Sequence, residues 1–243
     1  MSESEDKYVK GLKERSEKTD EYYRKSVVKT EQQKFLEELL NKSRRNFSNI
    51  ADIACGGGTL SFHLQKLFPE AKFTLSDFND DAIKIAKEIN GDQHRYIQGN
   101  IYDLKELKND EFDLVCCWQT LSWLDEPEKA LNELLRITKP GGKIYISSLF
   151  NIHHDVDIYT QMSDRSGSEE NVPAFAYNTY AAKSVRKWLN GKANEVVFHE
   201  FIPSIDFKYD GRGFGTFTVQ TEKHRLQISG GYLMNWAILD ITK

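Results

Sequence analysis

The stretch that decides the fold reads Ile50-Ala51-Asp52-Ile53-Ala54-Cys55-Gly56-Gly57-Gly58-Thr59. It begins as an apolar run, continues through residues with little or no side chain, and opens into a segment of helical character. Because glycine has no Cβ, such a turn lets a ligand lie directly against the backbone. The N–H groups at the start of the helix then face that ligand. The stretch therefore predicts a ligand-binding turn between a first strand and a helix.

The spacing of small residues in this turn argues against a dinucleotide ligand. The dinucleotide pattern G-x-G-x-x-G is not met, because Thr59 stands three residues past Gly56 and Ser61 three residues past Gly58. Asp52 precedes the first small residue, Ala54, by two positions. A carboxylate there repels a pyrophosphate and suits a ligand that carries a cation or an amino-acid group.

Segments of strand and helix character alternate around this turn, which predicts an α/β domain with a parallel sheet covered on both faces. The expected strands are 50–54, 73–76, 95–98, 112–118 and 143–149, and the expected helices are 30–44, 59–68, 79–89 and 127–138. Beyond residue 150 the order changes to a polar lid over 151–178, a helix over 181–189 and a strand over 196–202. An inserted hairpin is expected within 203–231, around a turn at 221–223, and a final strand within 231–242.

The pattern D-x-(small)-x-G-x-G at Asp52, Ala54, Gly56 and Gly58 resembles motif I of the class I S-adenosylmethionine-dependent methyltransferases. Family members usually carry glycine where this chain has Ala54. Other motifs follow in order: Asp77 after the second strand, the strand and loop from Asp113 to Leu124, and the turn Lys139-Pro140-Gly141-Gly142. The resemblance implies a Rossmann-like, mostly parallel central sheet with an antiparallel last strand. It also implies S-adenosyl-L-methionine as cofactor and S-adenosyl-L-homocysteine as product.

The resemblance also assigns expected cofactor contacts to positions that match the family pattern. Asp77 would accept the ribose hydroxyls, although an acid favouring the following helix dipole is the simpler alternative. Asn100 stands where the family often has an acid for the adenine amino group, and a plain turn asparagine is its alternative. The remaining expected contacts are Asp52, Ala54, Gly56 and Gly58 in the turn, Phe78 and Ile101 at adenine, Cys117, Trp118 and Gln119 at the methionine portion, and Tyr23 in a covering N-terminal arm.

Candidates for a general base follow the fifth expected strand. His153 and His154 titrate in the useful range, and Asp155 could orient one of them, whereas an exposed polar loop is the competing interpretation. Other candidates are assigned by location alone. These are Tyr22 and Arg24 in the arm, and Tyr177, Asn178, Tyr180, Arg212, Arg225 and, with less support, Trp123 near the acceptor.

Composition narrows the class of protein. The chain has 243 residues and a net charge of −4 without a basic block, so we expect no nucleic-acid partner. The three cysteines lack metal spacing, no apolar run is long enough to span a bilayer, and the acidic start is unlike a signal peptide. We therefore expect one cytoplasmic methyltransferase domain over 1–243, with an arm or N-terminal helical cap at 1–29, a cofactor half at 30–150 and a substrate half at 151–243.

The acceptor and the assembly stay open at this point. A small-molecule acceptor methylated at oxygen or nitrogen is favoured, because the lid and hairpin provide surface for a bounded pocket. The hairpin could equally be a contact in a homodimer. An RNA or protein methyltransferase is less favoured, because the motif Asn/Asp-Pro-Pro-aromatic is absent after Val115. A non-catalytic cofactor-binding module and an NAD-dependent dehydrogenase are the remaining alternatives.

Overall fold

The computed structural model describes residues 23, 28–163, 174–206, 208, 216–229, 232–234 and 236–243. Most of the expected N-terminal arm, with Tyr22 and Arg24, and also Arg212 lie outside the described residues.

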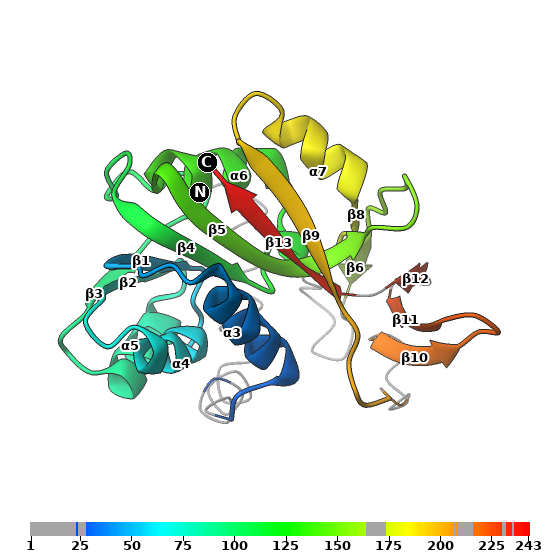
Figure 1. Ribbon diagram of the computed structural model, residues 1–243, viewed down its shortest axis with the longest axis horizontal. Helices are drawn as coiled ribbons and strands as arrows, with labels where there is room; N and C mark the ends of the chain where they lie inside the picture. Colours follow the sequence, from blue (N-terminus) through cyan, green and yellow to red (C-terminus); the bar gives the residue numbers. More distant parts are fainter. Residues whose placement is uncertain are drawn as a thin grey trace.

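A central sheet of eight strands has the order β3-β2-β1-β4-β5-β13-β9, with β8 paired to the end of β5 (Figure 1). The strands are β1 (Asn49–Ile53), β2 (Lys72–Asp77), β3 (Arg95–Gln98), β4 (Phe112–Trp118), β5 (Thr138–Asn151), β8 (Tyr180–Ala181), β9 (Glu195–Phe201) and β13 (Trp236–Thr242). β1 to β5 pair in parallel, whereas β13 runs antiparallel to both β5 and β9. The mostly parallel sheet with an antiparallel last strand is thus confirmed.

The strand order reverses at β1, whose neighbours are β2 on one side and β4 on the other. In open α/β sheets a ligand crevice forms outside the carboxyl ends of the strands at such a reversal. The glycine turn follows the carboxyl end of β1, and Asp77 ends β2. The topology therefore gathers the expected cofactor residues at one edge of the sheet.

Helices cover both faces of the sheet, as expected. α3 (Glu31–Ser43), α4 (Thr59–Leu67) and α5 (Asp80–Asn90) pack on one face, and α6 (Pro127–Ile137) and α7 (Ala182–Leu189) pack on the other (Figure 1). Each face has its own buried apolar cluster, built around Leu36 and Leu64 on one side and Leu134 and Val185 on the other.

Capping residues fix the helix boundaries close to the predicted positions. Thr30 caps α3 and forms a capping box with Gln33, and α3 ends at Arg44 in a left-handed conformation. The Asn79 side chain accepts a hydrogen bond from the Asp81 N–H at the start of α5.

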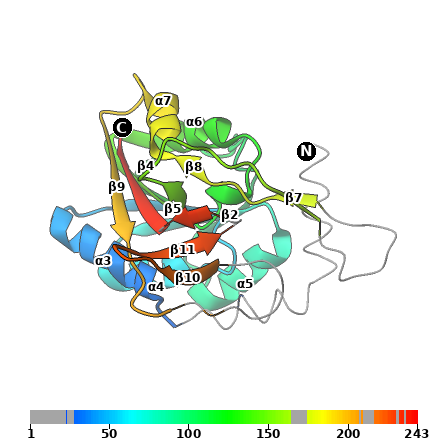
Figure 2. The same cartoon turned by 90° about the vertical axis from the view of Figure 1, so that its right-hand side faces the viewer.

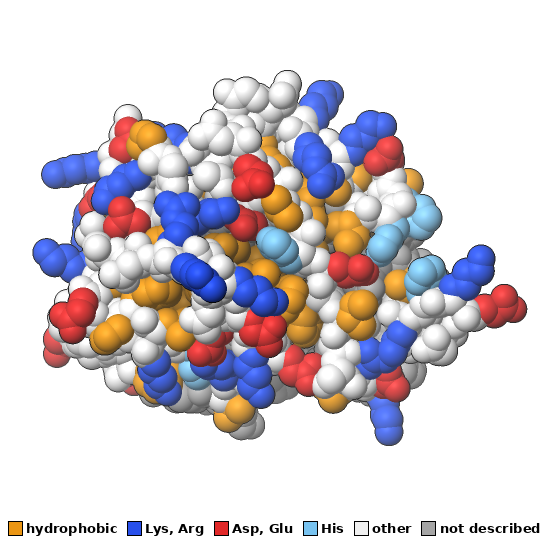
Figure 3. Space-filling model, in the orientation of Figure 1, with side chains coloured by type: hydrophobic (Ala, Val, Ile, Leu, Met, Phe, Trp, Pro, Cys, Tyr) orange, Lys and Arg blue, Asp and Glu red, His pale blue; other side chains and the backbone are white. Residues whose placement is uncertain are grey.

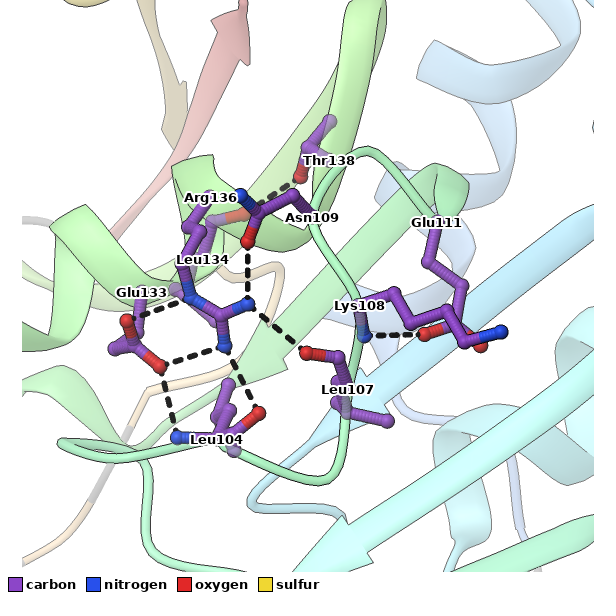
Figure 4. Close-up of polar contacts among 9 residues, drawn as sticks. All are labelled: Leu104, Leu107, Lys108, Asn109, Glu111, Glu133, Leu134, Arg136 and Thr138. Carbon is purple, nitrogen blue, oxygen red and sulfur yellow. Dashed lines mark hydrogen bonds and ion pairs between the residues drawn. The ribbon is translucent and has the colours of Figure 1, made fainter.

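The connection between β3 and β4 is a loop rather than a helix, and α6 holds it in place (Figure 4). The Arg136 guanidinium donates to the carbonyls of Leu104 and Leu107 at 2.8 and 2.9 Å and to Asn109 Oδ1 at 2.9 Å. Glu133 pairs with Arg136 and also accepts the Leu104 N–H at 2.8 Å. We call these five residues the Arg136 clasp.

The predicted start of one strand was wrong. The strand expected over 143–149 begins earlier, because β5 includes Lys139-Pro140-Gly141-Gly142 as an irregularity in its pairing with β4. Gly141, with φ +73°, permits the local turn. The final strand expected within 231–242 is confirmed as β13, and β12 (Tyr232–Met234) precedes it in the chain.

The inserted hairpin is confirmed as β10 (Thr216–Gln220) and β11 (Arg225–Ser229), closed by a Thr221 N–H to His224 carbonyl bond of 2.8 Å. β12 adds a third, unpredicted strand, and this small sheet contacts the main sheet through β5 (Figures 1 and 2). The described part of the expected lid contains the strand pair β6 (Gln161–Ser163) and β7 (Ala174–Ala176).

Within the described residues, every helix is too short or too polar to cross a membrane.

Candidate functional site

The turn after β1 has a left-handed backbone at every second residue. Ala54, Gly56 and Gly58 have φ values of +57°, +52° and +73°. This conformation is unfavourable for residues with a Cβ, so the alternation of small residues in the sequence has a backbone cause. Ala54 alone among the three adopts it with a side chain, which marks a strained position beside the expected ligand.

Asp77 joins the turn to the carboxyl end of β2. Its Oδ2 accepts the Gly56 N–H at 2.8 Å, and its Oδ1 accepts the Asn79 N–H at 2.9 Å. Burial raises the pKa of the Asp77 carboxyl, while backbone hydrogen bonds from Asn79, Gly56 and Phe78 oppose that rise. These three bonds leave about one of the four lone-pair sites of the carboxylate for a bond from a ligand.

Asp52 lies fully buried beneath the turn, and only one of its oxygens has a partner. Oδ2 accepts the Ser61 hydroxyl at 2.8 Å, whereas Oδ1 is buried without a hydrogen-bond donor. Burial raises the pKa of Asp52 to about 7, against the lowering effect of the Ser61 bonds. An unsatisfied buried carboxylate oxygen is costly, which suits a position that a cationic ligand group completes.

The glycines of the turn meet two different neighbours. A Cβ on Gly58 would stand 2.5 Å from Asn90 Nδ2, so the α4–α5 packing excludes a side chain there. A Cβ on Gly56 or Gly57 would stand 2.9 Å from Tyr23 side-chain atoms. Tyr23 therefore lies over the turn, where the sequence placed a covering residue.

The expected adenine contacts sit at the ends of β2 and β3. Phe78 is half-buried and follows Asp77 directly, and Ile101 is buried against the cluster on the α6 face. The Asn100 Oδ1 accepts the Tyr102 N–H at 2.8 Å, as a turn asparagine does.

The three expected methionine contacts at the end of β4 point in different directions. The Cys117 thiol is buried in the cluster on the α6 face, where burial raises its pKa to about 12. Trp118 packs against the cluster on the α3 face. Gln119 adopts a left-handed backbone, with φ +54°, and its Nε2 donates to Gln32 Oε1 at 3.0 Å.

The two candidate bases lie away from the glycine turn. His153 Nε2 is 2.9 Å from Glu200 Oε1 on β9, which is the edge strand farthest from β3. His154 is exposed, and its backbone N–H donates to Asn151 Oδ1. Asp155, expected to orient a histidine, instead pairs with Lys183 at 2.9 Å. The structure therefore does not bring these residues together with Gly56 and Asp77.

The residues expected near the acceptor divide into two groups. Tyr177 packs on Trp123 with ring centroids 4.6 Å apart, and the buried Asn178 and Tyr180 both donate to the Leu124 carbonyl in the loop after β4. Arg225 on β11 instead bonds to Asp206 and to the Pro203 carbonyl.

Sequence reasoning missed Gln32 on α3, which is 3% exposed. It lies one helical turn before Leu36 and two before Leu40 on the buried side of α3. A polar residue on an apolar helical stripe was the available signal.

The described residues contain no group of three His, Cys, Asp or Glu side chains that could hold a metal ion. All three cysteines are free thiols. On the face shown in Figure 3, basic and acidic side chains are interspersed around apolar ones.

Comparison with known proteins adds independent evidence. Residues 51–146 match the family model described as a methyltransferase domain. Malonyl-[acyl-carrier protein] O-methyltransferase of Hahella chejuensis is 28% identical over 202 residues, covering 77% of this chain and 67% of that protein. The chain spans only about half the length of other curated relatives, for example 53% and 43%.

Solved structures share the fold at low identity. An S-adenosylmethionine-dependent methyltransferase from Clostridium acetobutylicum superposes with a TM-score of 0.58 at 14% identity, covering 95% of this chain and 98% of that one. The 1,6-didemethyltoxoflavin-N1-methyltransferase of Burkholderia thailandensis, solved with bound 1,6-didemethyltoxoflavin and S-adenosylhomocysteine, gives a TM-score of 0.53 at 12% identity. That match covers 87% of this chain and 76% of the other.

Proposed function

We propose that this chain, which carries a class I S-adenosylmethionine-dependent methyltransferase domain, transfers a methyl group from S-adenosylmethionine to an oxygen or nitrogen atom of a small molecule. The observation that carries the proposal is the left-handed turn at Ala54, Gly56 and Gly58, tied to Asp77 through the Gly56 N–H. This geometry offers backbone N–H groups and a carboxylate at one edge of the sheet.

The residues present fit that cofactor. Asp77 would accept a ribose hydroxyl with its remaining lone pair, and Asp52 Oδ1, which is buried without a donor, would take the amino group of the methionine portion. Phe78, Asn100 and Ile101 would border the adenine, and Tyr23 would cover the turn. The roles of Cys117, Trp118 and Gln119 at the methionine portion remain predictions.

The bound cofactor supplies an already electrophilic methyl group, so the protein has mainly to align the acceptor. The loop after β4, the end of β5 and the small sheet β10–β12, which contacts β5, would provide the walls for that alignment. A general base at His153 or His154 remains a prediction. Replacing both with alanine should lower turnover while leaving the affinity for S-adenosylhomocysteine unchanged.

Calorimetric titration with S-adenosylhomocysteine tests the proposal. The wild-type chain should bind it, and NAD should produce no comparable heat. Asp77→Asn should weaken binding by about tenfold or more, because a charge-assisted bond to the ribose is lost. Asp81→Asn, at a half-exposed acid in the first turn of α5, is the matched control and should bind normally. Tight binding of NAD alone would contradict the proposal and favour a dehydrogenase.

A further inference from the structure

Three side chains near the carboxyl end of β5 carry buried polar atoms that no protein group satisfies. They are Gln32 Nε2 on α3, Trp236 Nε1 at the start of β13, and both amide atoms of Gln227 on β11. Leaving a buried N–H without a partner costs about 1–3 kcal/mol, so each such group calls for a ligand or a bound water.

The orientation of the Gln32 amide is fixed by its neighbours. Its Oε1 accepts the Gln119 Nε2 at 3.0 Å and the Ser147 hydroxyl at 2.9 Å. Those donors stand just after the end of β4 and near the end of β5, beside the crevice of the fold. With the oxygen occupied, the two N–H bonds of Nε2 are left for another acceptor.

Trp236 lies on the same face of the sheet as Gln32. It pairs with Leu149 on β5 and with Phe201 on β9, and directly opposed residues of antiparallel strands point to one face. The Phe201 ring contacts Phe35, one turn after Gln32 on α3, with centroids 5.8 Å apart. The indole N–H and the Gln32 amide therefore belong to one neighbourhood, between α3 and the junction of β5 and β13.

The small sheet closes this neighbourhood from the hairpin side. Gln227 is fully buried and shares its face of β11 with Arg225, which bonds to Asp206 and to the Pro203 carbonyl. Ser204, in the same segment, bonds to Glu31 in the first turn of α3. The face of β11 that carries Gln227 is thus turned toward the start of α3.

The chemistry of these atoms selects the ligand. The Gln32 and Trp236 groups are neutral N–H donors, and the residues that contact them, Gln119, Ser147 and Phe201, are also neutral. A phosphate or sulfate would call for a cationic partner. An amine would find one vacant acceptor, Gln227 Oε1 on the small sheet, but none at Gln32, whose oxygen already accepts two bonds. A neutral carbonyl oxygen, with two lone pairs, matches the donors.

We propose that Gln32 and Trp236 are specificity-determining residues of the acceptor site, and that their N–H groups bind a neutral carbonyl oxygen, of an amide, ester or ketone, in the molecule that is methylated. This inference rests on the proposed function, because that function identifies the crevice as a methyl-transfer site. It adds the class of acceptor, which the glycine turn does not specify.

Salicylamide and 2-ethylphenol are suitable probes, because both carry a phenol and only the first carries a neutral carbonyl. Each is titrated by calorimetry into the chain, with and without S-adenosylhomocysteine, and ¹H–¹⁵N spectra follow the Trp236 indole signal. Trp236→Phe removes the indole N–H and keeps an aromatic ring. Gln32→Glu keeps the oxygen that accepts from Gln119 and Ser147 and removes the donors.

Salicylamide should bind the wild-type chain, shift the Trp236 signal and bind each variant about fivefold or more weakly, the value of one hydrogen bond. 2-Ethylphenol should bind all forms alike. Trp188→Phe, on α7 at the opposite face, and the exposed Gln93→Glu serve as controls and should match the wild type. Melting curves identify any variant that fails to fold. If either Trp236→Phe or Gln32→Glu does not fold, the salicylamide affinity of the other one tests the inference.

Equal binding of the two probes, an unmoved Trp236 signal, or full salicylamide affinity in a folded variant would overturn the inference. Failure of S-adenosylhomocysteine to bind would overturn the proposed function instead. The titration of salicylamide alone would still decide whether the two donors take a carbonyl.

Discussion

Ala54 shows how one backbone conformation can set the effect of a substitution. Its φ of +57° costs an alanine about 1–2 kcal/mol, whereas glycine adopts it freely. Ala54→Gly should therefore leave the free energy of unfolding unchanged or raise it by up to about 1 kcal/mol, after the added entropy of the unfolded chain. Thermal melting checks this.

Ala130→Gly in α6 is the matched control. Ala130 is buried within a regular helix, so its replacement should lower stability by about 1 kcal/mol or more. An equal loss for both variants would show that the left-handed position is not strained.

Asp52 gives the free energy of unfolding a pH dependence of defined sign. The carboxyl titrates near 3.9 in an unfolded chain and at about 7 in the fold, because it is buried. Between these values the folded state binds more protons, so stability falls as pH rises from about 4 to about 7, and the effect levels off above that. The raised pKa of Asp77 acts in the same direction.

Asp52→Asn should flatten this part of the stability profile, measured by urea unfolding between pH 5 and 8. The exposed Asp92→Asn, whose carboxylate pairs with Lys87, should leave the slope as it is. A wild-type profile that rises with pH in this window and is unchanged in Asp52→Asn would contradict the burial of a protonated carboxyl.

At the scale of the elements, the loop between β3 and β4 is tied to α6 mainly by Arg136, which bonds to Leu104, Leu107 and Asn109. Arg136→Lys keeps the charge but cannot reach the Leu104 and Leu107 carbonyls and Asn109 together, because lysine lacks the planar fork. The free energy of unfolding should fall by about 2–3 kcal/mol. Amide hydrogen exchange in residues 104–109 should accelerate most.

Glu128→Gln on the same helix removes an exposed ion pair with Lys192 and should change stability by less than about 0.5 kcal/mol. If Arg136→Lys also changed the free energy of unfolding by less than about 0.5 kcal/mol, the loop would be held by its apolar residues instead.

Elements that are specified by neighbouring residues could be predicted from the sequence, whereas elements that depend on distant strands could not. The helices α3 and α5 and the strand β4 were predicted within a residue or two, because caps and buried apolar runs are local signals. The irregular start of β5 and the strand β12 were missed, because their pairing depends on strands far along the chain.

The same distinction between local and long-range signals explains why only part of the candidate site could be predicted. The turn and Asp77 carry local backbone constraints that spacing reveals. Gln32 approaches Gln119 across 87 positions of sequence, and the His153 contact with Glu200 spans 47, so neither contact follows from local pattern.

For the molecule as a whole, ligand binding should appear as thermal stabilisation. At a concentration of S-adenosylhomocysteine about 100 times its dissociation constant, mass action adds about 2.7 kcal/mol. For a chain of this size that corresponds to a rise in Tm of about 5–10 °C. Differential scanning fluorimetry measures it, with NAD at the same concentration as the control. Absence of any shift with saturating ligand would contradict the proposed cofactor site.

The Arg136 clasp has a consequence for heat sensitivity. The clasp closes one flank of the sheet, on the α6 side, while the glycine turn and Asp77 lie at the carboxyl ends of β1 and β2. A variant with a weakened clasp should therefore be temperature-sensitive: it should be active at low temperature and lose activity reversibly on modest warming. A protease should then nick such a protein first between Leu104 and Asn109.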